Sequence, residues 1–161
     1  MIANASDPSG VESAYTDDEQ LVTVFVGGQM FGLPILQVRD VFIVSSVTPI
    51  PLAPTSVAGL FNLRGRVLTM LSMRAMLGFE RSGDKTETTA IGIEWRGESF
   101  GLLVDRVGEV LALAKSAREK NPMNLDSRWG ALSAGVHRLN DQLLVELSLD
   151  TLFNHSLKQA A

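Results

Sequence analysis

The chain contains an internal repeat, and this repeat constrains the fold more than any other feature of its 161 residues. Residues 22–42 align without a gap on residues 91–111, and residues 59–73 align on residues 135–149. The offset is 69 residues in the first block and 76 in the second, so the second copy carries a connection seven residues longer. Because both blocks recur in the same order, we expect two copies of one small β unit.

Each copy opens with the pattern of a β-hairpin. In the first copy, residues 21–26 are apolar on both alternating faces, which predicts a central strand. Gly27 and Gly28 interrupt this pattern before residues 30–33 resume it. Residues 67–73 predict a further strand and residues 74–78 a short helical turn that ends at a glycine.

A unit of four or five short strands is only marginally stable by itself, because a small sheet must cover its apolar face. The predicted fold class is therefore all-β, with two barrels packed through a shared apolar seam and with short helical turns. The copies are placed at residues 22–77 and 91–153, within a domain at residues 20–155. A tail is expected at each end, over residues 1–19 and 156–161.

The charges are unevenly distributed along the chain. The first 19 residues hold five acidic and no basic residues, and the remainder holds all 14 basic residues with 13 acidic ones. We therefore predict a disordered acidic N-terminal tail and a nearly neutral body, which has no overall field to attract nucleic acid or anionic lipid. Because no apolar run reaches 18 residues and the first basic residue is Arg39, no membrane insertion and no secretory signal are expected, and the predicted location is the cytoplasm.

The sequence offers little support for an enzyme. It has no cysteine and only two histidines, so we expect no disulfide, no thiolate nucleophile, no metal and no cofactor. Phosphate-binding glycine motifs and the G-x-S-x-G motif do not occur. A hydrolytic triad could be assembled only around His137 with Asp141, and His137 is expected to face solvent.

The segment Asn62–Arg66 places two arginines around a glycine before an apolar strand. This pattern predicts a turn whose guanidinium groups either bind a partner carboxylate or phosphate or remain solvated. A nucleic-acid-binding small barrel is an alternative function, since Arg39, Arg66 and Arg74 add positive charge. That alternative needs exposed aromatic side chains, and several of the ten aromatic residues occupy core-like strand positions.

A set of motifs in a fixed order gives the chain a recognisable pattern over roughly residues 20–155. The motifs are Phe31-Gly32-Leu33, Ile35-Leu36-x-Val38-x-Asp40-Val41, Pro51-x-Ala53-Pro54, Gly59, Asn62-Leu63-Arg64-Gly65, Gly101-Leu102-Leu103-Val104-Asp105-x-Val107 and Leu143-Leu144-Val145-Glu146-Leu147. In this order and spacing, the set resembles the CheW family of bacterial chemotaxis coupling proteins.

The resemblance implies two SH3-like five-stranded barrels around a common core, and a non-enzymatic adaptor. It implies that the adaptor joins chemoreceptor cytoplasmic tips to the regulatory domain of the histidine kinase CheA. The adaptor would be a monomer in solution and would assemble with CheA into mixed rings at membrane chemoreceptor arrays.

By resemblance, the receptor tip binds in the groove between the barrels, at Ile35, Val38, Asp40, Gly59 and Arg64. A helical hairpin needs apolar anchors, which Ile35 and Val38 would supply, and orienting charges, which Asp40 and Arg64 would supply. Core packing is the alternative role for Ile35 and Val38. Gly59 is expected to serve backbone conformation first.

The chain departs from the family pattern after the Asn62–Gly65 motif. Members often carry a proline and then Asp-Leu-Arg in the following strand, whereas this chain has Thr69 and Ser72-Met73-Arg74. Loss of that aspartate removes a partner for a neighbouring arginine, so the local salt bridges, and with them the preferred kinase, are expected to differ.

Overall fold

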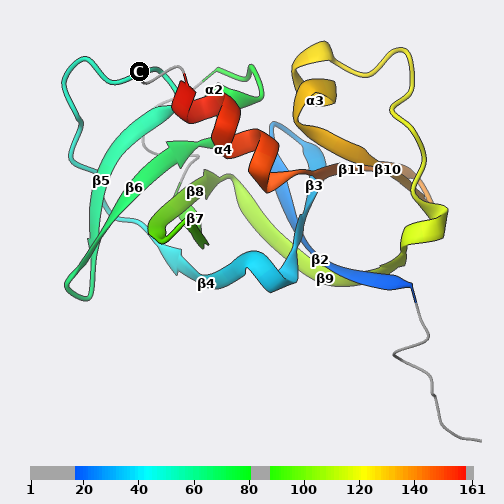
Figure 1. Ribbon diagram of the computed structural model, residues 1–161, viewed down its shortest axis with the longest axis horizontal. Helices are drawn as coiled ribbons and strands as arrows, with labels where there is room; N and C mark the ends of the chain where they lie inside the picture. The colour runs from blue at the N-terminus through cyan, green and yellow to red at the C-terminus, as the bar shows by residue number, and fades with distance from the viewer. Residues whose placement is uncertain (1–16, 81–87, 159–161) are drawn as a thin grey trace, which may run out of the picture.

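The computed structural model describes residues 17–80 and 88–158, and these residues form two five-stranded sheets joined by short helices (Figure 1). The first sheet, here barrel one, has the order β10 (Ser133–Leu139), β11 (Gln142–Leu147), β3 (Gln29–Pro34), β2 (Asp18–Val26) and β9 (Arg106–Ala114). The second, barrel two, has the order β4 (Val38–Ile43), β7 (Thr89–Trp95), β8 (Glu98–Val104), β6 (Arg66–Ser72) and β5 (Val57–Leu63). The helices are η2 (Ile35–Gln37), α2 (Met73–Met76), η4 (Lys115–Ala117), α3 (Ser127–Leu132) and α4 (Leu149–Lys158).

The two sheets exchange strands between the halves of the chain. Barrel one combines the hairpin β2–β3 with β9, β10 and β11, and barrel two combines the hairpin β7–β8 with β4, β5 and β6. Each exchange is made by one antiparallel pair and one parallel pair: β2 with β9 and β3 with β11, then β7 with β4 and β8 with β6. Since neither barrel is complete without both halves, we expect the two barrels to fold together.

Equivalent residues of the two hairpins face the same surroundings. Phe31 and Leu33 of β3, and Phe100 and Leu102 of β8, point into one core that lies between the barrels. Successive side chains alternate across a strand, so the glycine between each pair faces a barrel interior. A Cβ at Gly32 would crowd Leu144 and Leu21, and one at position 101 would crowd Met70. The Phe-Gly-Leu motif is thus explained by packing on both faces.

Helix α4 completes the shared core. Its residues Leu149, Leu152 and Phe153 are fully buried, and the Phe153 ring lies 4.8 Å from the Phe100 ring, centroid to centroid. Figure 1 shows this helix crossing the top of the molecule between the two sheets. Fully burying side chains of this size stabilises the fold by about 1.5–3 kcal/mol each.

The predicted fold class is confirmed, while three local expectations need correction. Strand β2 begins at Asp18, because Asp18 and Glu19 pair with β9, so residues 18 and 19 are not part of a tail. Residues 156–158 are likewise helical, because α4 continues past the expected end and buries Ser156. Met73 opens α2 rather than ending the strand, because the Ser72 hydroxyl caps the helix. The rest of the expected tails, residues 1–16 and 159–161, lies outside the described residues.

Candidate functional site

The turn between β5 and β6 is built by the Asn62–Gly65 motif. Arg64 and Gly65 both have positive φ, 52° and 87°, which is the geometry of a type I′ hairpin turn. Asn62 Oδ1 accepts a hydrogen bond from the Gly65 amide at 2.9 Å, and Leu63 packs against the interior of barrel two. Arg64 is exposed and forms no ion pair with the described residues. The motif therefore holds one unpaired cation at the tip of a rigid hairpin.

Gly59 serves a close approach between two backbone segments. The segment after β4 crosses β5 there, and Thr48 and Leu60 exchange two backbone hydrogen bonds of 2.9 and 2.8 Å. A Cβ at Gly59 would overlap the Thr48 carbonyl oxygen, and the φ of 147° is itself unfavourable for other residues. Gly59 thus closes barrel two and has no side chain to offer a partner.

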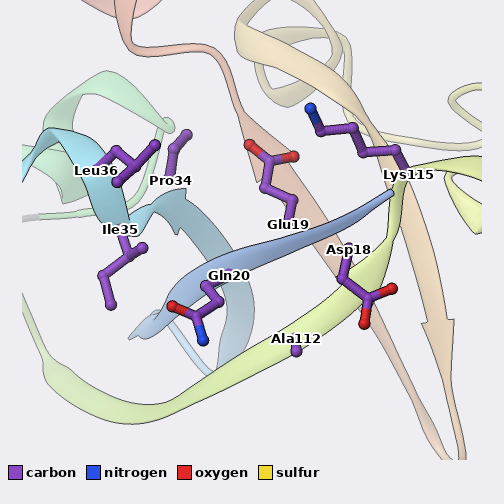
Figure 2. A pocket seen from close by; sticks show the side chains of 8 residues that line it. All are labelled: Asp18, Glu19, Gln20, Pro34, Ile35, Leu36, Ala112 and Lys115. Atoms are coloured by element: carbon purple, nitrogen blue, oxygen red, sulfur yellow. The ribbon is translucent and has the colours of Figure 1, made fainter. Parts of the chain in front are cut away.

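Ile35 lies where the chain passes from one barrel to the other. Helix η2 connects β3 of barrel one to β4 of barrel two, and both Ile35 and Val38 are half-buried against the shared core. A surface pocket of about 470 Å³ opens beside Ile35 (Figure 2). Its lining residues are Asp18, Glu19, Gln20, Pro34, Ile35, Leu36, Ala112 and Lys115.

Asp40 lies near Arg66, an arginine that is not among the five receptor-binding residues implied by the resemblance. Nη2 of Arg66, on β6, lies 4.0 Å from Asp40 Oδ2, whereas Oδ1 is buried against Gly92 without a hydrogen-bond partner among the described residues. The β-bulge between Val38 and Asp40 leaves Arg39 beside Glu94 of β7, with which it pairs. Sequence reasoning missed the role of Arg66, because the distance between β4 and β6 depends on how the intervening strands pair.

The five predicted receptor residues do not line one cavity. Val38, Asp40, Gly59 and Arg64 all belong to β4, β5 or the β5–β6 turn of barrel two, and only Ile35 lines the pocket. The same barrel exposes several large apolar side chains, which sequence reasoning also missed. They are Val41 and Ile43 on β4, Leu60 on β5, Val67 on β6, and Ile50 and Leu52 in the proline-containing segment. Exposed apolar surface is typical of protein–protein contacts, and these side chains are the exposed apolar surface of barrel two.

A comparison with family models gives the affiliation of the chain. The model described as a CheW-like domain matches residues 20–157. This chain belongs to the CheW-like family. Its members are non-enzymatic scaffold proteins of chemotaxis signalling, so the prediction that the chain is not an enzyme is confirmed.

Several chemotaxis proteins named CheW are similar to this chain over most of their length. The chemotaxis protein CheW of Treponema pallidum is 27% identical over 149 residues, covering 89% of this chain and 88% of the relative. That of Rhizobium meliloti is 28% identical over 142 residues, covering 88% and 92%. The crystal structure of the scaffolding protein TtCheW from Thermoanaerobacter tengcongensis matches with a TM-score of 0.73 at 27% identity, over 84% of this chain and 92% of that one.

The departure from the CheW sequence pattern is compensated within the fold. Arg74 reaches across to β8–β9 and binds Asp105 through two hydrogen bonds, from Nε at 2.8 Å and from Nη2 at 2.7 Å. Asp105 also accepts a hydrogen bond from the Gly27 amide at 2.9 Å. Ser72, which stands at the position of the usual aspartate, accepts the Ala75 amide as a helix cap. The arginine therefore keeps a carboxylate partner.

His137 is not exposed, contrary to expectation. It lies inside barrel one with 5% of its side chain exposed, and its Nε2 lies 2.9 Å from Glu146 Oε1. The alternation of β10 places it opposite Leu144, on the interior face. Among the described residues, no helix is long and apolar enough to span a membrane, and no group of acidic and histidine side chains could hold a metal ion.

Proposed function

We propose that this CheW-like protein couples chemoreceptor signalling tips to the histidine kinase CheA, and that the receptor tip docks where η2 joins the barrels. The observation that carries the proposal is the position of Ile35, half-buried at the junction and beside a pocket of about 470 Å³. A helical hairpin that enters there can bury Ile35 and Val38 further. Asp40 and the unpaired Arg64 then orient the helix from barrel two.

The exposed apolar side chains of β4, β5 and β6 support a second protein contact on barrel two, for which the regulatory domain of CheA is the proposed partner. Val41 and Ile43 expose 49% and 72% of their surface, and Val67 exposes 60%. Since these residues lie on strands, their backbone is fixed before binding, and docking costs little conformational entropy. We propose that alternating contacts of this kind build the mixed rings at membrane receptor arrays, with the free protein a cytoplasmic monomer.

No observation favours the nucleic-acid alternative. Each aromatic side chain in the described part of the chain is at least partly buried, so none is presented as a stacking platform. Two of the arginines that suggested a basic surface are neutralised, since Arg39 pairs with Glu94 and Arg74 with Asp105.

Co-sedimentation of receptor signalling fragments with CheA, with and without this protein, tests the proposal. We expect CheA to sediment with the receptor only when the protein is present. Arg64→Glu should weaken this coupling while changing the free energy of unfolding by no more than about 0.5 kcal/mol, as for other exposed positions.

Arg96→Glu is the matched control, because Arg96 occupies a turn with the same positive-φ arginine–glycine pair. It should leave the coupling intact. Equal recruitment of CheA without the protein contradicts the coupling function. A folding collapse in Arg64→Glu would instead assign Arg64 to structure.

A further inference from the structure

Barrel one encloses a charged cluster that receptor or kinase docking does not explain. Glu146 exposes 4% of its side chain, and it accepts a hydrogen bond from Arg118 Nη1 at 3.1 Å on Oε2. His137 contacts the other carboxylate oxygen. The Arg118 charge offsets that of Glu146, which is the condition under which a buried carboxylate is tolerated.

A second carboxylate, that of Glu19, faces this cluster from β2. Glu19 and Leu21 share one face of β2, just as Glu146 and Leu144 share one face of β11. Both leucines lie inside barrel one, against Gly32. Figure 2 shows the Glu19 side chain on the opposite side of β2 from Asp18 and Gln20, where it lines the pocket beside Ile35. The two carboxyl groups therefore meet where the barrel interior opens into the pocket.

Charges of both signs surround Glu19. Burial, and then the charge and hydrogen-bonding capacity of the neighbouring Glu146, raise the pKa of Glu19 above its ordinary value. Lys115 and Arg118 oppose this increase. The other nearby groups are uncharged or paired elsewhere: Leu113 opposite Glu19 on β9, Gly32 opposite Glu146 on β3, Asp17 bound to the Ser116 amide, and Glu119 paired with Arg138.

We propose that Glu19 and Glu146 share one proton at the mouth of barrel one, and that this proton holds the N-terminal end of β2 against the barrel. A hydrogen bond between two carboxyl groups needs a proton on one of them. Without it, two negative charges face each other in a partly desolvated site, where Arg118 pairs with Glu146 and Lys115 is the remaining nearby cation.

The direction of the pH effect follows from the raised pKa. The folded protein binds the Glu19 proton more tightly than the unfolded chain does. This stabilisation is fully present below the ordinary glutamate pKa and is lost as the pH rises through the raised, folded-state pKa. At neutral pH the pair therefore weakens barrel one.

A consequence for docking rests on the proposed receptor function. Glu19 lines the same pocket as Ile35, so a helix that covers this pocket removes water from the carboxyl group. Desolvation favours the protonated form. Receptor binding should therefore draw a proton from solution, and acidification should strengthen it.

Thermal unfolding of the full chain between pH 4.5 and pH 8 tests the shared proton, with wild type compared against Glu19→Gln at each pH. Glutamine is isosteric with the protonated acid and can donate to Glu146. We expect Glu19→Gln to raise the Tm at pH 8 by about 2–4 °C, and the difference to vanish as the pH falls. Glu109→Gln, at an exposed position of β9, is the control and should show no such trend.

Two results would overturn the proposal: a lower Tm for Glu19→Gln at pH 8, or a difference that does not change with pH. The increase should also disappear in a Glu146→Gln background, since the two sites would no longer repel. Calorimetry of receptor-fragment binding in buffers of different ionisation enthalpy tests the consequence, with proton uptake in wild type and none in Glu19→Gln. If the fragment does not bind at all, the receptor proposal fails while the unfolding data still decide the shared proton.

Discussion

The interiors of the two barrels differ although their strands pair in the same register. In barrel two, Phe61 lies opposite Leu68 and Gly59 opposite Met70. The equivalent residues of barrel one, 76 positions later, are His137 opposite Leu144 and Gly135 opposite Glu146. Where barrel two stacks the rings of Phe42 and Phe61, barrel one therefore places an imidazole against a carboxylate.

This difference shows that one backbone can hold either an apolar or a charged interior. Both barrels have the same strand pairing, and both direct the side chains on one face of their strands into the shared core between them. These two common features specify the fold. The interior residues are free to differ as long as each buried polar group is paired, as Arg118 and His137 do for Glu146.

The largest expected effect comes from breaking the charged interior. Glu146→Ala leaves Arg118 and His137 without their carboxylate and should lower the free energy of unfolding by about 3–5 kcal/mol. The double variant His137→Phe with Glu146→Met copies barrel two and should recover most of that loss. Urea unfolding at pH 7 measures both. A double variant as unstable as the single one would show that barrel one needs its charges to fold.

A smaller loss of stability is expected at the connections between the barrels, where one copy has an ion pair and the other does not. Asp105 binds Arg74, whereas the equivalent residue of the first copy, Leu36, is 95% exposed. Asp105→Asn weakens a charge-assisted pair that exposes 16–20% of its side chains, so we expect a loss of about 2 kcal/mol by urea unfolding. Asp126→Asn, in an exposed pair with Arg128, is the control and should change stability much less. Equal effects would mean that the bridge to Arg74 is no stronger than a surface pair.

The smallest expected effect is a difference in stability between alanine variants of Gly59 and Gly135, the glycines at equivalent positions of the two barrels. Both have φ near 145°, but a Cβ at Gly59 would meet the Thr48 backbone first, whereas at Gly135 it would meet the Arg118 side chain first. A side chain moves more easily than a backbone segment. Gly59→Ala should therefore destabilise the protein by about 1 kcal/mol more than Gly135→Ala in the same thermal melts. The reverse order would indicate that the Arg118 position, which holds Glu146, is the more rigid of the two.

Part of the proposed site could be predicted from local sequence. Asn62 and Gly65 specify their turn through a side-chain hydrogen bond and a positive φ, so the exposure of Arg64 at the tip follows from the motif. The pairing of Asp40 with Arg66 could not be predicted, because it depends on strands β7 and β8 lying between β4 and β6 in the sheet. The pocket beside Ile35 could not be predicted either, since residues of β2, β9 and η4 complete it.

The sequence by itself determined the repeat, the hairpins, the glycine turns and the two-barrel class, because these depend on neighbouring residues and on alternation along a strand. Only the tertiary structure decided which half completes which barrel, that the acidic residues 17–19 belong to the folded sheet and its edge rather than to a tail, and that His137 is buried beside Glu146. The physical reason is that strand exchange pairs β2 with β9, so that Asp18 lies opposite Ala114, 96 positions later, and that the β10–β11 hairpin buries His137 only once the barrel has closed around it.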